Sequence, residues 1–210
     1  MSVIDKLAVS LQIHSDEPNQ ALADEIIETN DHAAVKELVE NLFHKDKRIQ
    51  SNCIKVLYEI GERGAPAIIA PYWKEFLSLL SSKNNRLVWG SMIALDMIAL
   101  LKPSELFEKI DLIRHTVNHG SVITMDHGVS IYAKLTSIAE YEDKALHFLW
   151  DSLRTCPPKQ FPQYMERSMI AINRKNRQLF TDLANARSTV LETDSQRKRV
   201  EKVVKHCNSL

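Results

Sequence analysis

Two histidines four residues apart, His115 and His119, come closest to a metal-binding spacing. Positions four apart share one face of a helix, and Asp126 or His127 from a following helix could supply a third ligand. His119 also stands directly before Gly120, where an imidazole favours the C-terminal end of a helix dipole whether or not a metal is present. The sequence has no HExxH motif and no second spaced pair of ligands. We therefore expect no metal and no cofactor.

Signatures of other catalytic sites are missing from the sequence. Gly61–Gly64 has neither the GxGxxG nor the Walker spacing of a phosphate loop, and neither a GxSxG motif nor a cysteine-nucleophile signature occurs. Paired carboxylates for acid–base chemistry would have to come from Asp96, Asp126 or Glu166, whose separation the sequence does not fix. A non-catalytic protein is therefore the first expectation.

Composition favours a folded protein of the cytoplasm. Of 210 residues 44% are hydrophobic, and only five glycines and seven prolines interrupt them. No apolar run is long enough to cross a membrane, and the N-terminus has acidic residues in place of the apolar core of a secretory signal. The three cysteines, Cys53, Cys156 and Cys207, lack CxxC spacing and suit reduced thiols. Cys53 is expected to be an inert core residue.

Net charge is zero, but it is distributed unevenly. Residues 1–60 carry 11 acidic and 6 basic side chains, whereas residues 161–210 carry 5 acidic and 10 basic ones. The basic excess includes the segment QRKRVEKVVKH near the C-terminus, which could contact phosphates of a nucleic acid. Its candidate contacts are Arg197, Lys198, Arg199 and Lys202. Random variation on solvated helix faces would give the same asymmetry, so both interpretations stay open.

The elements that position these residues are read from a repeated apolar pattern. Counting from Arg86 as zero, apolar or small residues at offsets 1, 5, 8, 9 and 12 fall on one helix face, and the pair Gly90–Ser91 would let a neighbouring helix approach closely. The same pattern begins at Arg48, Ile123 and Gln163, so successive starts are 38, 37 and 40 residues apart. This period is typical of a helical repeat array.

The rest of the chain is also expected to be helical. Asp46 is expected to cap one helix, and Asn84–Asn85 are expected to separate two others. Pro71 is expected to kink its helix or delay its start, and Asp194 is expected to cap the last helix. No strand is expected, so the fold class is all-α. The expected helices span about 2–12, 18–29, 32–44, 47–61, 66–80, 85–99, 103–119, 123–135, 142–155, 160–174, 179–190 and 195–205.

The paired helices resemble HEAT repeats of the armadillo-like class. The stretches DKRIQSNCIKVLYEIG and NNRLVWGSMIALDMIA carry the resemblance: Asp46 and Arg48 match its opening polar residues, and Asn84 and Arg86 match them in part. The copies at Ile123 and Gln163 depart further, and the pattern is clearest over 31–175. The resemblance implies a right-handed α-α superhelix of about five helix pairs, a single domain over 1–210, with 1–30 and 176–210 as capping helices.

The resemblance also implies that the second helix of each pair lines a concave groove. Positions opposite the apolar face would project there, and an exposed tryptophan and isoleucine beside acidic residues would make a partner-binding patch. The alternative, that Trp89 and Ile93 are core residues, stays open. The candidate groove residues are Trp89, Ile93, Asp96, Asp126, Ser130, Glu166 and Asn173.

The sequence therefore predicts a cytoplasmic scaffold that binds another protein in its groove and does not act at a membrane. The alternative is a nucleic-acid-binding protein, because the HEAT-like alkylpurine DNA glycosylases are similar in size and have aromatic and acidic residues in their concave site. Trp89, Asp126 and Arg167 would be the candidates for such base excision. The tight Trp and Asp grouping of that family is not matched, since the position four after Trp89 is Ile93.

Overall fold

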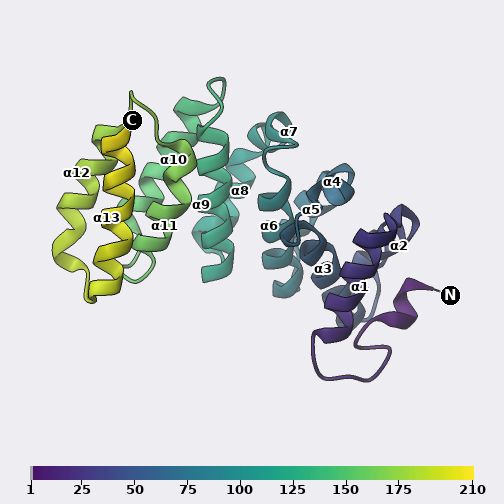
Figure 1. Cartoon of the computed structure of the whole chain (residues 1–210). Coiled ribbons are helices and arrows are strands. Elements are labelled where there is room, and N and C mark those ends of the chain that lie inside the picture. Colours follow the sequence, from purple (N-terminus) through teal and green to yellow (C-terminus); the bar gives the residue numbers. More distant parts are fainter. Residues whose placement is uncertain (1) are drawn as a thin grey trace. The chain divides into compact units, whose positions relative to one another are not determined.

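The computed structural model describes residues 2–210, and every regular element among them is a helix (Figure 1). The all-α expectation is therefore confirmed for the described residues. None of their helices is long and apolar enough to cross a membrane. The chain divides into two compact units, Met1–His127 and Gly128–Leu210.

The first unit begins with a short 3-10 helix, η1 (Val3–Lys6), so the helix expected over 2–12 is mostly absent. Residues 7–16 are irregular, because side chains take up backbone donors that a helix would use: Asn19 accepts from the Ala8 N–H at 3.0 Å and Asn52 accepts from the Val9 N–H at 3.2 Å. Gln12, at φ 58°, turns the chain in the left-handed region.

Helices α1 (Glu17–Thr29) and α2 (His32–Glu40) follow, and α2 continues into η2 (Asn41–Phe43). Asn30 ends α1 at φ 50°, a left-handed conformation that asparagine tolerates well. Asp31 begins α2 by accepting a hydrogen bond from the Ala34 N–H. The expected helices over 18–29 and 32–44 are thus confirmed within a few residues.

Helix α3 (Lys47–Glu62) is capped by Asp46, as expected. After Gly64, the apolar stretch expected to be kinked is divided into α4 (Pro66–Ile69), η3 (Ala70–Tyr72), α5 (Trp73–Ser78) and η4 (Leu79–Ser81). Pro71 lies inside η3, where its missing N–H and its ring interrupt the regular α-helical bonds.

Helix α6 (Asn85–Ile98) is capped by Asn84 and packs closely on α3. Two glycines allow this approach: a Cβ on Gly90 would stand 2.6 Å from Cγ1 of Ile54, and a Cβ on Gly61 would stand 2.8 Å from Cβ of Met97. The close approach expected at Gly90 is confirmed. Helices α7 (Pro103–Glu108), α8 (Ile110–His119) and α9 (Val122–Thr136) follow.

The second unit holds the rest of α9 and four further helices, α10 (Glu142–Thr155), α11 (Phe161–Arg167), α12 (Arg177–Arg187) and α13 (Asp194–Ser209). The helix expected over 160–174 is shorter, because α11 tightens into η5 (Ser168–Ala171) and the chain then leaves in an extended conformation at Ile172. A second 3-10 segment, η6 (Ser188–Val190), follows α12.

The cap of α13 was predicted one residue too late. Thr193 is the N-cap, and its side chain accepts a hydrogen bond from the Gln196 N–H while Gln196 accepts from the Thr193 N–H. This reciprocal pair satisfies two N–H donors at the helix start. Asp194 is the first helical residue and lies beside the positive end of the helix dipole.

Candidate functional site

Two of the three groove residues predicted on α6 are buried. Ile93 is 5% exposed and Asp96 is 1% exposed, whereas Trp89 is half-buried. The expectation that Ile93 and Asp96 face a partner directly is therefore wrong. Helix α6 is apolar nearly all round, and such a helix is covered by neighbours on more than one side.

Asp96 lies in the core because its carboxylate has a polar partner. Oδ2 of Asp96 is 2.7 Å from Nδ1 of His127, the last residue of the first unit, and the imidazole is itself mostly covered. A buried carboxylate without a partner would cost several kcal/mol. The hydrogen bonds of His127 within residues 2–210 include none to a hydroxyl or thiol. Asp126, next to it in the chain, is half-buried.

The two histidines considered as metal ligands instead contact each other. The rings of His115 and His119 lie 4.4 Å apart between centroids, and Nδ1 of His119 is 2.8 Å from the carbonyl oxygen of His115. Among residues 2–210, no three side chains of His, Cys, Asp or Glu gather closely enough to hold a metal ion. This arrangement places two imidazoles side by side at the end of α8.

Trp89 lines a cavity together with these imidazoles. The cavity has a volume of about 450 Å³ and lies between the C-terminal end of α8, the start of α9 and one side of α6. Tyr58 on α3 supports the indole, with ring centroids 5.8 Å apart at 54°. Apart from Trp89 and the two histidines, its lining includes Leu80, Val88, Ser121 and Thr124. We name it the Trp89 cavity.

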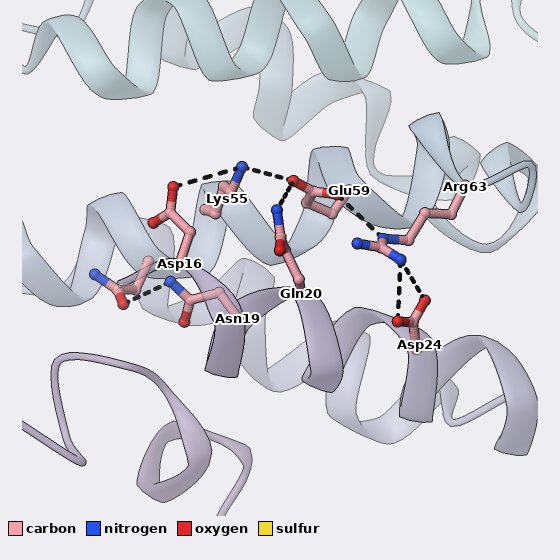
Figure 2. Close-up of polar contacts among 8 residues, drawn as sticks. Asp16, Asn19, Gln20, Asp24, Lys55, Glu59 and Arg63 are labelled. Carbon is pink, nitrogen blue, oxygen red and sulfur yellow. Dashed lines mark hydrogen bonds and ion pairs between the residues drawn. The ribbon is translucent and has the colours of Figure 1, made fainter. Parts of the chain in front are cut away.

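A ladder of charged side chains joins α1 to α3, and Figure 2 shows it from the side. Nζ of Lys55 is 2.6 Å from Glu59 and 3.7 Å from Asp16. Arg63 lies 3.1 Å from Glu59 and 2.7 Å from Asp24. This ladder was not predicted, although Lys55, Glu59 and Arg63 follow one another at the four-residue spacing of helical ion pairs.

The ladder places opposite charges where solvent is limited. Burial is the largest single influence on the pKa of the Glu59 carboxyl and acts to raise it, but the hydrogen bond and charge of Lys55 together with the bonds from Arg63 and Gln20 outweigh burial, so the pKa is lowered. Gln20 adds a weaker bond to Glu59 at 3.4 Å. Between the same two helices, Nδ2 of Asn19 donates to Oδ1 of Asn52 at 2.8 Å. The ladder fixes α1 on α3.

Glu62, one turn beyond Glu59, is the exposed acidic residue at the end of α3. Partial loss of solvent around its carboxylate raises its pKa, and the negative charges of Glu59 and Asp96 raise it further, against the opposing influence of His127 and Lys55. The end of α3 and the Asp96–His127 pair thus influence each other electrostatically within the first unit.

In the second unit, the three remaining groove candidates are engaged within the fold. Ser130 is buried on α9. Glu166 on α11 accepts hydrogen bonds from Arg199 at 3.0 and 2.5 Å, and Asn173 donates to Glu142 at 3.0 Å. Because Glu166 already pairs with a cation, it is less available to an outside partner than the sequence suggested.

The basic residues of α13 divide into two groups. Arg197 binds Asp194 at 2.8 Å and the Leu191 carbonyl at 2.6 Å, and Arg199 binds Glu166. Lys198 and Lys202 are exposed, as is Lys205 one turn further on. The lysines therefore remain available to phosphates, whereas Arg199 joins α13 to α11 and Arg197 contacts residues at the start of its own helix.

Comparison with known proteins identifies a fold and no family. No family model matches the chain, and no curated protein matches it. An engineered protein solved by the Northeast Structural Genomics Consortium is 17% identical, with a TM-score of 0.61 over 100% of this chain and 98% of that one. A second engineered protein from the same consortium is 14% identical, with a TM-score of 0.59 over 98% of this chain and 58% of that one. At these identities the likeness supports the helical fold alone.

Proposed function

We propose that this protein is a HEAT-like α-solenoid and a non-catalytic interaction module. Its helices follow one another as candidate pairs, α2 with α3, α5 with α6, α8 with α9, α10 with α11 and α12 with α13. Asp46 and Asn84 cap α3 and α6 at equivalent places, which agrees with the repeat of 38 residues. Stacked helix pairs of this kind give extended surfaces for another chain.

Trp89 is the observation that carries the proposed binding role. Half-buried, supported by Tyr58 and lining a cavity of about 450 Å³, it combines a large apolar surface with a fixed orientation. Tryptophans in such settings commonly supply much of the affinity of protein interfaces. We therefore place the docking of a partner segment at the Trp89 cavity.

The test compares two tryptophans of the same unit. Trp73 on α5 is also half-buried, but it does not line the Trp89 cavity. Affinity capture from an extract of the cells that make the protein would identify partners, whose Kd is then measured with purified components. We expect Trp89→Ala to weaken binding about tenfold or more and Trp73→Ala to leave it unchanged. Equal affinity of the wild type and Trp89→Ala would contradict the proposed site.

Nucleic-acid binding is the second candidate function, and the exposed lysines of α13 favour it. Lys198, Lys202 and Lys205 are spaced four and three residues apart, so they share one face of the helix. Three such cations could contact successive phosphates.

Fluorescence anisotropy with labelled duplex DNA tests this candidate. Neutralising Lys198, Lys202 and Lys205 together should abolish binding at about 150 mM salt, since each phosphate contact adds to the salt dependence. The control neutralises Lys36, Lys45 and Lys47 instead, which are exposed in the first unit. No binding by the wild type at that salt would remove this candidate, and binding that survives the α13 substitutions would remove these lysines as its site. Binding that depends on the lysines would make base excision the next assay.

A further inference from the structure

A second recess lies at the N-terminal end of α3, and it shares no lining residue with the Trp89 cavity. Here the irregular segment 8–16 passes α3 and leaves a cavity of about 730 Å³. A neighbouring cavity of about 450 Å³ shares three of its lining residues, Arg48, Asn52 and Arg86. The two cavities therefore adjoin around two guanidinium groups, and we name them together the arginine recess.

Arg48 and Arg86 hold the same position in successive second helices. Each is the second residue of its helix, α3 or α6, and each backbone N–H is taken by the cap before it, Asp46 at 2.8 Å and Asn84 at 3.1 Å. The caps thus occupy these N–H donors at the helix ends. An anion in the recess would be held mainly by the side chains.

The two guanidinium groups differ in how many of their hydrogen-bond donors already have a partner. Arg48 uses Nε and Nη2 to contact Asp46, at 3.3 and 2.8 Å, and keeps Nη1 for other partners. The exposed side chain of Arg86 makes no hydrogen bond or ion pair with any of residues 2–210. A cation at the edge of a recess with all five of its donors unused is suited to an external acceptor.

The other charges of the recess leave it positive. Exposed Lys47 lines it beside Arg48, and Asp16 is the one carboxylate among its lining residues within the described chain. Asp16 itself lies 3.7 Å from Nζ of Lys55, which offsets part of its negative charge. With Asp46, the partner of Arg48, counted as well, three cations face two carboxylates, one of which is partly offset by Lys55, and this balance favours an anion.

The remaining wall offers polar and apolar groups to the body of a ligand. Gln12, His14 and Ser15 are exposed, and their side chains make no hydrogen bond with residues 2–210. Ile13 between them is 46% exposed. Asn52 is not offered to a ligand, because its side-chain amide already bonds to Val9, Asn19 and the Arg48 carbonyl.

We propose that the arginine recess binds a small molecule that carries a phosphate group. A phosphate monoester holds close to two negative charges near neutral pH, which matches two guanidinium groups better than a single carboxylate does. Planar guanidinium groups also bind phosphate oxygens through two parallel hydrogen bonds. The cavity volume of about 730 Å³ is within the range of small-molecule sites. The phosphate would lie at Arg86 and the free edge of Arg48, with the body of the ligand against Ile13 and Gln12.

Isothermal titration of the whole protein with pyrophosphate, at low and near-physiological salt, tests the proposal. The wild type is expected to bind, and Arg86→Gln is expected to weaken the Kd about tenfold or more, because a charge-assisted bond of a guanidinium is lost. Arg86→Lys, which keeps the charge without the planar fork, should lie between the two. Since Arg86 is exposed, thermal melting should be unchanged in both variants.

Arg154→Gln is the matched control. It removes the same charge from an exposed helical position of the second unit whose side chain has no partner among residues 2–210. The proposal is overturned if the wild type does not bind pyrophosphate, if Arg86→Gln binds as tightly as the wild type, or if Arg154→Gln weakens binding equally. Duplex DNA that binds through Arg86 while pyrophosphate does not would also overturn it, by assigning the recess to a polyanion.

Discussion

Asp46 shows how one residue serves both a helix end and a charge pair. Its carboxylate accepts a hydrogen bond from the Arg48 N–H at 2.8 Å and contacts the Arg48 guanidinium at 2.8 and 3.3 Å. The side-chain bond from Arg48, followed by the backbone bond, lowers the pKa of Asp46 from its ordinary 3.8 to about 2. The lowered pKa of Asp46 is therefore a measure of these two hydrogen bonds from Arg48.

The first prediction concerns the titration of Asp46. Its carboxyl carbon, followed by NMR, should titrate with a midpoint of about 2, and Arg48→Gln should move that midpoint up towards 3.8. Because the pKa of the folded state lies below that of the unfolded state, the carboxylate stabilises the fold fully above pH 4. That contribution is lost as the pH falls from about 4 to about 2. Arg86→Gln is the control and should leave the midpoint in place.

The environment of a single residue was predicted well where its place in the apolar pattern decided whether it was buried. Cys53 was expected in the core, and it is fully buried, with burial raising its pKa to about 12. Ile93 was assigned to the groove from its angle on the helical wheel. A wheel gives the direction of a side chain relative to one neighbour only, so it missed the further elements that cover α6.

At the scale of elements, short-range signals predicted most helix boundaries. Asp46 caps the helix that it was expected to cap, and Asn84, expected to separate two helices, caps the second of them, because capping depends on a few adjacent residues. The helix expected over 2–12 failed for a long-range reason. Asn52, more than 40 positions away, accepts the N–H of Val9, and no local pattern carries that information.

The ladder between α1 and α3 and the arginine recess both depend on how segments distant in the sequence pack together. Lys55, Glu59 and Arg63 were visible as a charge pattern on one helix, but Asp16 and Asp24 are chosen by the packing of α1. Arg48 and Arg86 were noted as equivalent repeat positions. Their common cavity depends on the path of segment 8–16, which the sequence analysis had assigned to a helix and a break.

The second prediction concerns the crossing of α3 and α6. Alanine in place of a helical glycine usually stabilises by up to about 1 kcal/mol. At Gly90 the new Cβ would stand 2.6 Å from Cγ1 and 3.2 Å from Cγ2 of Ile54, so one helix has to shift. We expect Gly90→Ala to lower the free energy of unfolding by about 1–2 kcal/mol, measured by urea denaturation.

A double-mutant cycle separates this clash from other effects. Ile54→Ala removes the atoms that the new Cβ would meet, so Gly90→Ala should cost much less in that background, with a coupling of about 1 kcal/mol. The measurement would contradict the close-approach interpretation if Gly90→Ala stabilised the wild-type protein, or if its cost were the same in both backgrounds.

At the scale of the whole molecule, the described residues form two compact units, and each unit contains buried cysteines. Cys53 belongs to the first unit, whereas Cys156 and Cys207 belong to the second. All three are free thiols, and burial is the main cause that raises the pKa of each. Their reaction with a thiol reagent therefore requires local opening, which makes them reporters of the unit in which they lie.

The last prediction uses these reporters to ask whether the units open separately. Leu149 on α10 is fully buried in the second unit, and Leu149→Ala should destabilise that unit by about 2–5 kcal/mol. Labelling with N-ethylmaleimide, quantified by peptide mass spectrometry, should then accelerate about thirtyfold or more at Cys156 and Cys207 and little at Cys53. Gly90→Ala, in the first unit, should instead accelerate labelling mainly at Cys53 and little at Cys156 and Cys207. In the repeat array that we propose, stability would be carried by each repeat and its nearest neighbours, so damage would stay local. Equal acceleration at all three cysteines in both variants would instead indicate a single cooperative domain over 1–210, as the sequence predicts.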